Sequence, residues 1–110
     1  MSGAFHTKLM EPAANVVKIA LKKIPIQQPT ISVHSNIDGK RYRNSDHILK
    51  CLPQQVVKPV CWEQTMHVLY ERNQDQHYPM SFECGPGSSL KSILKMVNAK
   101  AAAMCTTVSV

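Results

Sequence analysis

Apolar residues recur at three- and four-residue steps near the start of the chain, and this spacing predicts a helix over Thr7–Lys23. Pro12 falls in the early turns, where proline is tolerated better than in the middle of a helix. The residues expected on the apolar face are Leu9, Ala13, Val16, Val17, Ala20 and Ile24. We therefore expect this face to pack against the rest of the fold.

The middle of the chain predicts a strand followed by a helix. The segment Thr30–Asn36 has the composition of a short strand, and it runs into the turn sequence NIDGK. Ser45 and Asp46 are candidate N-caps for a helix that continues to about Val56. We expect Pro53 to break or bend this helix, because proline removes a backbone donor.

The second half of the chain predicts two helices and two strands. Val60–Arg72 has apolar residues at helical spacing, and the stretch MSFECGPGSSLKSILKMV predicts a strand, a tight Gly-Pro-Gly turn and a helix. Ser88 and Ser89 are placed to cap that helix. Its expected buried face is Leu90, Ile93, Leu94 and Val97. A final strand is expected over about Ala103–Val110.

Helices and strands alternate in this pattern, which predicts an α/β fold with short, largely parallel strands and flanking helices. A parallel sheet of three short strands has two open edges and needs helices on both faces. The pattern therefore indicates one part of a larger fold.

Composition and charge restrict the functional classes only weakly. A chain of 110 residues with 44% hydrophobic residues is long enough for one domain and too apolar to be disordered. No apolar run approaches the length of a membrane span. The net charge of +6 favours an acidic partner, and the densest basic run is Lys40–Arg43. That run can equally be a solvated turn, and no nucleic-acid-binding motif accompanies it.

The four cysteines suggest no metal site. Cys51, Cys61, Cys84 and Cys105 form no CxxC pair, and the histidines do not complete a zinc pattern. Because they lie in apolar segments, we expect them to be reduced side chains of an intracellular protein.

His6 is the candidate for acid–base chemistry, although a lone histidine is more often structural or solvated. A neutral imidazole can act as a general base only if a nucleophile lies beside it. The sequence has no G-x-S-x-G elbow, Ser2 lies next to the chain terminus, and the cysteines have the surroundings of core residues. The Gly85–Gly87 turn could direct amides at an anion, but a tight packing turn explains it better.

Four segments in a fixed order resemble the C-terminal third of malonyl-CoA:acyl-carrier-protein transacylases. They are SGAFHTKLMEPA, SVHSNIDG, QQVVKPVCWEQTM and FECGPGSSLKSIL. Each segment alone is a weak signal, but four segments in the family's order and spacing are a strong one. The resemblance covers nearly the whole chain. The residues of the stretches GAFHT, RYRNSDHI and WEQTMHVLYER are most similar to those of the animal mitochondrial members.

The resemblance implies a Ser–His ping-pong transfer of malonyl from CoA to the phosphopantetheine of a carrier protein in mitochondrial fatty-acid synthesis. It implies that His6 is the general base and acid and that the main-chain carbonyl of Gln55 orients it, leaving Nε2 free. Asn36 matches a polar residue near the family's site, and the turn Gly85–Gly87 matches a structural turn. The family's substrates are malonyl-CoA and the carrier protein, without a cofactor, metal, nucleic acid or membrane span.

The chain also departs from the family pattern. It lacks the serine elbow, the arginine that pairs with the malonyl carboxylate, the glutamine loop of the oxyanion hole and the ferredoxin-like subdomain. We therefore assign residues 1–110 to the C-terminal part of the hydrolase-like large subdomain and expect no activity and poor stability from the chain alone. The alternative is a non-catalytic module whose basic Lys40, Arg41 and Arg43 bind the acyl carrier protein or regulate the full enzyme.

Overall fold

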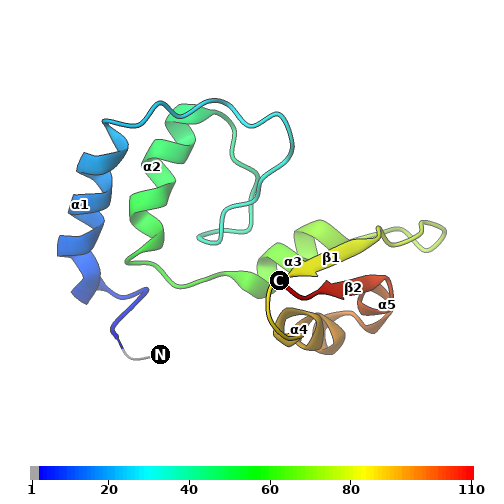
Figure 1. Ribbon diagram of the computed structural model, residues 1–110. Helices are drawn as coiled ribbons and strands as arrows, with labels where there is room; N and C mark the ends of the chain where they lie inside the picture. Colours follow the sequence, from blue (N-terminus) through cyan, green and yellow to red (C-terminus); the bar gives the residue numbers. More distant parts are fainter. Residues whose placement is uncertain (1–2) are drawn as a thin grey trace. The chain divides into compact units, whose positions relative to one another are not determined.

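The computed structural model describes residues 3–110, which divide into two compact units, one ending at Thr65 and the other comprising Met66–Val110. Figure 1 labels the helices and strands. They are the 3-10 turn η1 (Lys8–Met10), α1 (Glu11–Leu21), α2 (Ser45–Gln55), α3 (Trp62–Tyr70), β1 (Ser81–Cys84), α4 (Ser89–Val97), α5 (Ala99–Ala103) and β2 (Cys105–Val108).

The first unit is built on α1 and α2, which lie side by side and run in opposite directions (Figure 1). Ala14 of α1 and Cys51 of α2 are buried. The α-helix begins at Glu11, four residues later than the sequence predicts, and a 3-10 turn precedes it. Pro12 explains this start, because proline has no N–H and its fixed φ suits the first helical turn.

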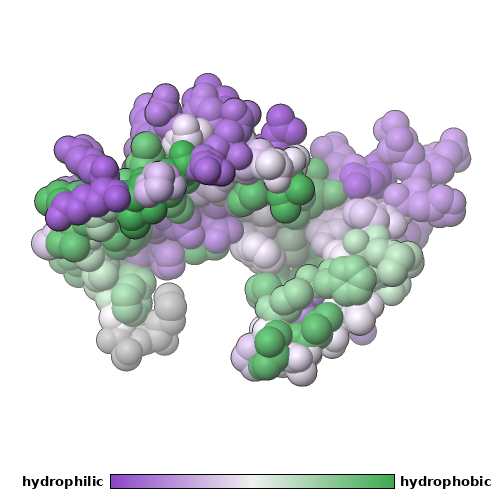
Figure 2. Space-filling view, turned by 45° about the horizontal axis from the view of Figure 1, so that its top comes forward, coloured by the Kyte–Doolittle hydropathy of each residue, from purple (hydrophilic) through white to green (hydrophobic). Residues whose placement is uncertain are grey.

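The apolar face predicted for α1 is not buried in this chain. Leu9 is 79% exposed and Val16 is 66% exposed, so this prediction is wrong for the chain by itself. The second helix covers only one narrow stripe of α1, and Ala14 is the residue of α1 that is buried. Hydrophobic side chains therefore reach the surface, as the green patches of Figure 2 show.

The strand predicted over Thr30–Asn36 is also wrong. In its place the chain folds back on itself, with a single antiparallel bridge between His34 and Arg41. Gly39 closes the turn with a φ of 71°, and a Cβ there would lie 2.9 Å from the backbone nitrogen of Thr65. The described residues of this unit offer no neighbouring strand, so the segment pairs only with itself.

Two details of α2 differ from the prediction. Asn44 is the N-cap, since its side chain accepts a hydrogen bond from the His47 backbone N–H at 2.8 Å, so Ser45 and Asp46 already lie inside the helix. Pro53 lies within the helix, and the helix continues to Gln55 without a break. A proline this close to a C-terminus removes only one of the last backbone hydrogen bonds.

The second unit confirms the predicted α/β class with a parallel pairing. Strands β1 and β2 pair in parallel, with Ser81 opposite Cys105 and Cys84 opposite Val108. Helices α4 and α5 follow β1 along the chain and return it to β2 (Figure 1). The final strand is shorter than predicted, because Ala99–Ala103 forms α5.

The short helix α5 is set by its N-cap. The Asn98 side chain accepts a hydrogen bond from the backbone N–H of Ala101 at 3.0 Å. The unit's core is small and includes Leu94, Ala101 and Cys105. On β1, Glu83 is buried whereas its neighbour Phe82 is 59% exposed, as expected for side chains that alternate between the faces of a sheet. No helix within residues 3–110 has the length and apolar character needed to cross a membrane.

Candidate functional site

His6 lies just before the 3-10 turn rather than in the first turn of α1, and its backbone is left-handed. Its φ is 62°, a value that few residues other than glycine adopt. Two main-chain carbonyls hold it there. The His6 backbone N–H donates to the Val56 carbonyl at 3.0 Å, and the ring nitrogen Nδ1 lies 2.8 Å from the Gln55 carbonyl oxygen. The histidine is thus fixed by both its backbone and its side chain.

Both carbonyls are available because α2 ends at Gln55. The last carbonyls of a helix have no intrahelical donor and must find another partner. The Gln54 carbonyl is already taken by the backbone N–H groups of Val57 and Lys58. Those of Gln55 and Val56 accept from His6, which is therefore placed at the negative end of the helix, where a positive charge is stabilised.

This geometry fixes the protonation pattern of the imidazole. A carbonyl oxygen can only accept a hydrogen bond, so the Nδ1 of His6 carries the proton and donates it to Gln55. The other ring nitrogen, Nε2, then has a free lone pair in the neutral ring. His6 is half-buried, and a neutral imidazole with this tautomer can take a proton at Nε2 from a hydroxyl or thiol.

A hydrogen bond joins Gln55 to His6, whereas Asn36 bonds to another segment. The Asn36 carbonyl accepts from the backbone N–H of Cys61 at 2.6 Å, and the hydrogen bonds of residues 3–110 do not connect Asn36 to His6. Sequence reasoning missed Thr7, whose hydroxyl donates to the Ala4 carbonyl at 2.6 Å. The available signal was the threonine itself, because threonine hydroxyls often bond to nearby backbone carbonyls.

The sequence offers Ser2 and four cysteines as candidate nucleophiles. The predicted weak candidate Ser2 lies outside the described residues. The cysteines are all free thiols. Burial raises the pKa of the Cys51 thiol, and the nearby Asp38 carboxylate raises it further, so Cys51 is a poor nucleophile. The hydrogen bonds given for residues 3–110 do not join any cysteine to His6.

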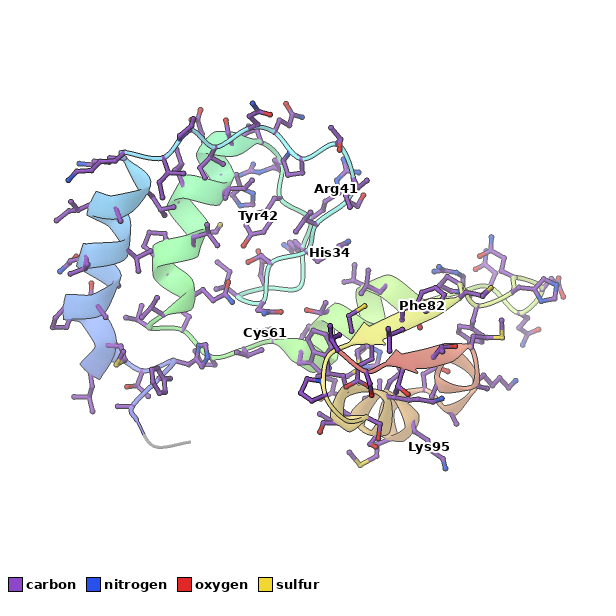
Figure 3. The ribbon with its side chains drawn as sticks, viewed as in Figure 1. His34, Arg41, Tyr42, Cys61, Phe82 and Lys95 are labelled. Carbon is purple, nitrogen blue, oxygen red and sulfur yellow. The ribbon has the colours of Figure 1, made fainter. Side chains whose placement is uncertain are left out.

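Within residues 3–110, no three His, Cys, Asp or Glu side chains gather in a way that could hold a metal ion. The basic run predicted as a docking surface lies on the loop between α1 and α2. Lys40, Arg41 and Arg43 are exposed, and Arg41 Nη1 donates to the Ser32 hydroxyl at 3.3 Å. Figure 3 labels Arg41 on this loop together with His34 and Tyr42.

The Gly-Pro-Gly turn leads into a helix end that the chain itself satisfies. The Glu83 carboxylate accepts from the backbone N–H of Leu90 at 2.9 Å and from that of Lys91 at 2.8 Å. Ser88 occupies the N-cap position, but its side chain makes no capping hydrogen bond, so the predicted serine cap is wrong. The Glu83 carboxylate thus already occupies two of the amides that an external anion could use at this helix end, and the structural interpretation of the Gly-Pro-Gly turn stays a prediction.

A cavity of about 490 Å³ lies against α4 and α5 in the second unit. Its lining includes the basic Lys91 and Lys95 and the hydroxyl-bearing Ser88, Ser92 and Thr107; Lys95 is labelled in Figure 3. The Ser92 hydroxyl donates to the Ser88 carbonyl at 2.9 Å. The lining contains no histidine or carboxylate.

Comparison with known proteins finds sequences similar to nearly the whole chain. The chain is 55% identical over 102 residues to the probable malonyl-CoA-acyl carrier protein transacylase, mitochondrial, of Drosophila melanogaster, a match that covers 93% of this chain and 27% of the relative. It is 52% identical over 101 residues to the human mitochondrial enzyme, with 92% and 26% coverage. The Escherichia coli K12 enzyme is 33% identical over 92 residues, with 84% and 28% coverage.

Solved structures give the same result. A malonyl-transacylase in complex with the acyl-carrier protein of a type II PKS superposes with a TM-score of 0.81 at 26% identity, covering 100% of this chain and 33% of that chain. The Mycobacterium tuberculosis enzyme superposes with a TM-score of 0.80 at 28% identity, covering 98% and 33%. No family model matches the chain.

These comparisons confirm the resemblance that the sequence motifs indicate, and they confirm the α/β fold class. The chain spans about a quarter of the length of the curated relatives it matches. The roles of His6, Gln55 and Asn36 stay predictions.

Proposed function

We propose that this chain is the histidine-bearing, C-terminal segment of a malonyl-CoA:acyl-carrier-protein transacylase, and that residues 1–110 belong to one acyltransferase domain completed by the remainder of the enzyme. The observation that carries the proposal is the 2.8 Å hydrogen bond between His6 Nδ1 and the Gln55 carbonyl. It gives the imidazole the tautomer and support that a general base needs, without an aspartate.

In the first half-reaction, a serine from the rest of the enzyme attacks the thioester carbonyl of malonyl-CoA. His6 Nε2 takes the hydroxyl proton as the serine oxygen bonds to the carbonyl carbon. The tetrahedral intermediate then expels the CoA thiolate, and the imidazolium returns the proton to it. The products are CoA and a malonyl-serine ester, so atoms and charge balance.

In the second half-reaction, His6 takes the proton of the phosphopantetheine thiol of the carrier protein. The thiolate attacks the malonyl-serine ester, and the serine oxygen leaves and recovers the proton from His6. The carbonyl of Gln55 stabilises the imidazolium in both halves through its hydrogen bond to Nδ1 and through the negative end of α2. No cofactor or metal takes part in this cycle.

The relatives support the proposed substrates and location. The fly, human and mouse relatives are mitochondrial malonyl-CoA-acyl carrier protein transacylases, which supports malonyl-CoA and an acyl carrier protein as substrates, fatty-acid synthesis as the process and the mitochondrion as the location. One neighbouring structure is a complex of such an enzyme with an acyl-carrier protein. The exposed apolar face of α1 supports a partner for this segment, because contiguous apolar surface of this kind is normally covered.

The test uses a chimera in which this chain replaces the matching segment of the Drosophila relative. We expect the chimera to transfer radiolabelled malonyl from CoA to the phosphopantetheinylated acyl carrier protein. His6→Gln should lower the rate by about 10²- to 10⁴-fold, the usual contribution of a general base. His34→Gln is the matched control, since the His34 ring also bonds to a carbonyl, that of Gly39 at 2.8 Å, in another part of the unit.

An unchanged rate in the His6→Gln chimera would contradict the assignment of the base. The 110-residue chain alone should give no adduct in intact-mass analysis after incubation with malonyl-CoA, because the described residues pair no nucleophile with His6. The alternative is a non-catalytic module with Lys40, Arg41 and Arg43 at its surface. It would be favoured if the chain binds the carrier protein while the chimera transfers no malonyl.

A further inference from the structure

The left-handed backbone of His6 needs support from its neighbours. A residue with a side chain at a φ of 62° is strained and persists only where the surrounding structure holds it. The strain has a geometric result, because the backbone N–H and the ring of the same residue reach two successive carbonyls, Val56 and Gln55. A relaxed backbone at His6 would direct at least one of these donors elsewhere.

Thr7 closes the turn that contains His6. Its hydroxyl donates to the Ala4 carbonyl at 2.6 Å, so the bond spans His6 from one side of the turn to the other. Thr7 itself is extended, with φ of −128° and ψ of 165°, and its carbonyl accepts from the Met10 backbone N–H at 3.1 Å. One hydrogen bond of Thr7 thus lies within the Ala4–Thr7 turn, and the other joins Thr7 to the 3-10 turn that leads into α1.

We propose that Thr7 is a positioning residue for His6. Its hydroxyl holds the Ala4–Thr7 turn closed, and the closed turn holds His6 in the left-handed conformation from which Nδ1 reaches Gln55. This inference rests on the proposed function, because it assigns a role in the same reaction. Thr7 is exposed and its hydroxyl bonds within its own turn, so it acts through the histidine and not on the substrate.

The kinetic test uses the chimera with Thr7→Val, which keeps the shape of the side chain and removes the hydroxyl. The maximum single-turnover rate of serine acylation should fall on the order of tenfold, because small displacements of a catalytic group are costly. The malonyl-CoA concentration that gives half of that rate should stay the same. Thr7→Ser keeps the hydroxyl and should restore the rate.

Thr65→Val is the matched control. The Thr65 hydroxyl donates to the Cys61 carbonyl at 2.9 Å, so this substitution removes the same kind of bond at a buried position that is not part of the Ala4–Thr7 turn. It should lower the thermal unfolding midpoint and leave the acylation rate of the folded enzyme unchanged. An equal loss of rate in Thr65→Val and Thr7→Val, or no rescue by Thr7→Ser, would overturn the positioning role.

A second measurement works on the 110-residue chain and does not need activity. Long-range nitrogen–proton NMR correlations of the His6 ring should show the proton on Nδ1 in the unsubstituted chain. Thr7→Val should shift the ring toward a mixture of tautomers, and unchanged ring signals in Thr7→Val would overturn the proposal. If His6→Gln lowers the transfer rate as expected while Thr7→Val leaves it unchanged, only this inference fails. An unchanged rate in the His6→Gln chimera would instead contradict the proposed function itself.

Discussion

Two helix ends in this chain meet the same requirement in opposite ways. The C-terminus of α2 leaves carbonyls without donors, and His6 supplies two N–H groups to Gln55 and Val56. The N-terminus of α4 leaves amides without acceptors, and both oxygens of Glu83 accept from Leu90 and Lys91. At each end, one residue from a distant or preceding segment bonds two of the groups that the helix leaves unpaired.

The two helix ends differ in whether the residue that bonds to the helix, His6 or Glu83, has a further polar atom that is not used in that bonding. Glu83 is buried, and each of its two carboxylate oxygens accepts a hydrogen bond from the helix. His6 uses Nδ1 and its backbone, and Nε2 stays available. One imidazole can therefore make a structural hydrogen bond through one nitrogen and carry chemistry on the other, because its two nitrogens are distinct. The Glu83 carboxylate, in contrast, uses both oxygens in structural hydrogen bonds.

The largest effect that tests this comparison is expected for Glu83→Gln. An amide oxygen can accept one of the two N–H bonds, but the NH₂ group cannot accept the other, and the negative charge at the helix N-terminus is lost. We expect a loss of about 1.5–3 kcal/mol of unfolding free energy, the range for hydrogen bonds to charged groups. Urea unfolding followed by circular dichroism measures it, and amide exchange at Leu90 and Lys91 should accelerate.

Glu71→Gln makes the same chemical change at an exposed residue and serves as its control. If both variants unfold at the same urea concentration, the Glu83 carboxylate does not hold α4.

A smaller effect is expected for Asn44→Ala at the other end of α2. The Asn44 side chain caps the helix by accepting from His47, and loss of such a cap costs about 1 kcal/mol. Because the cap is at the N-terminus of α2, the ring signals of His6 should not change. An altered His6 spectrum in this variant would show that the two ends of α2 are coupled, contrary to the independence that the comparison assumes.

The smallest effect is expected for Ser88→Ala. Serine at an N-cap normally contributes about 1 kcal/mol, but the Ser88 hydroxyl makes no capping bond because Glu83 takes the neighbouring amides. We expect a change below about 0.5 kcal/mol, as for ordinary surface substitutions. A loss as large as that in Asn44→Ala would mean that Ser88, as the sequence predicts, is the true cap.

Local sequence patterns determined most of the helices and the parallel α/β class. Periodicity predicts α2, α3 and α4 within a few residues of their observed bounds, because each has an apolar stripe at helical spacing. The motif resemblance also pointed to the pair His6 and Gln55, which the structure places 2.8 Å apart. The strand over Thr30–Asn36 was wrong because strand propensity needs a partner strand, which a single segment cannot reveal.

The tertiary structure alone decided which groups meet. His6 and Gln55 are separated by 49 positions, and only the packing of α1 beside α2 returns the start of the chain to the end of α2. The same holds for Glu83, which displaces the serines as the partner of the α4 amides. Residue types and spacing determined which elements form and which side chains can carry chemistry, since these depend on local interactions. The left-handed His6, its two carbonyl partners and the Thr7 bond required the folded chain, because a hydrogen bond depends on distance and direction in space.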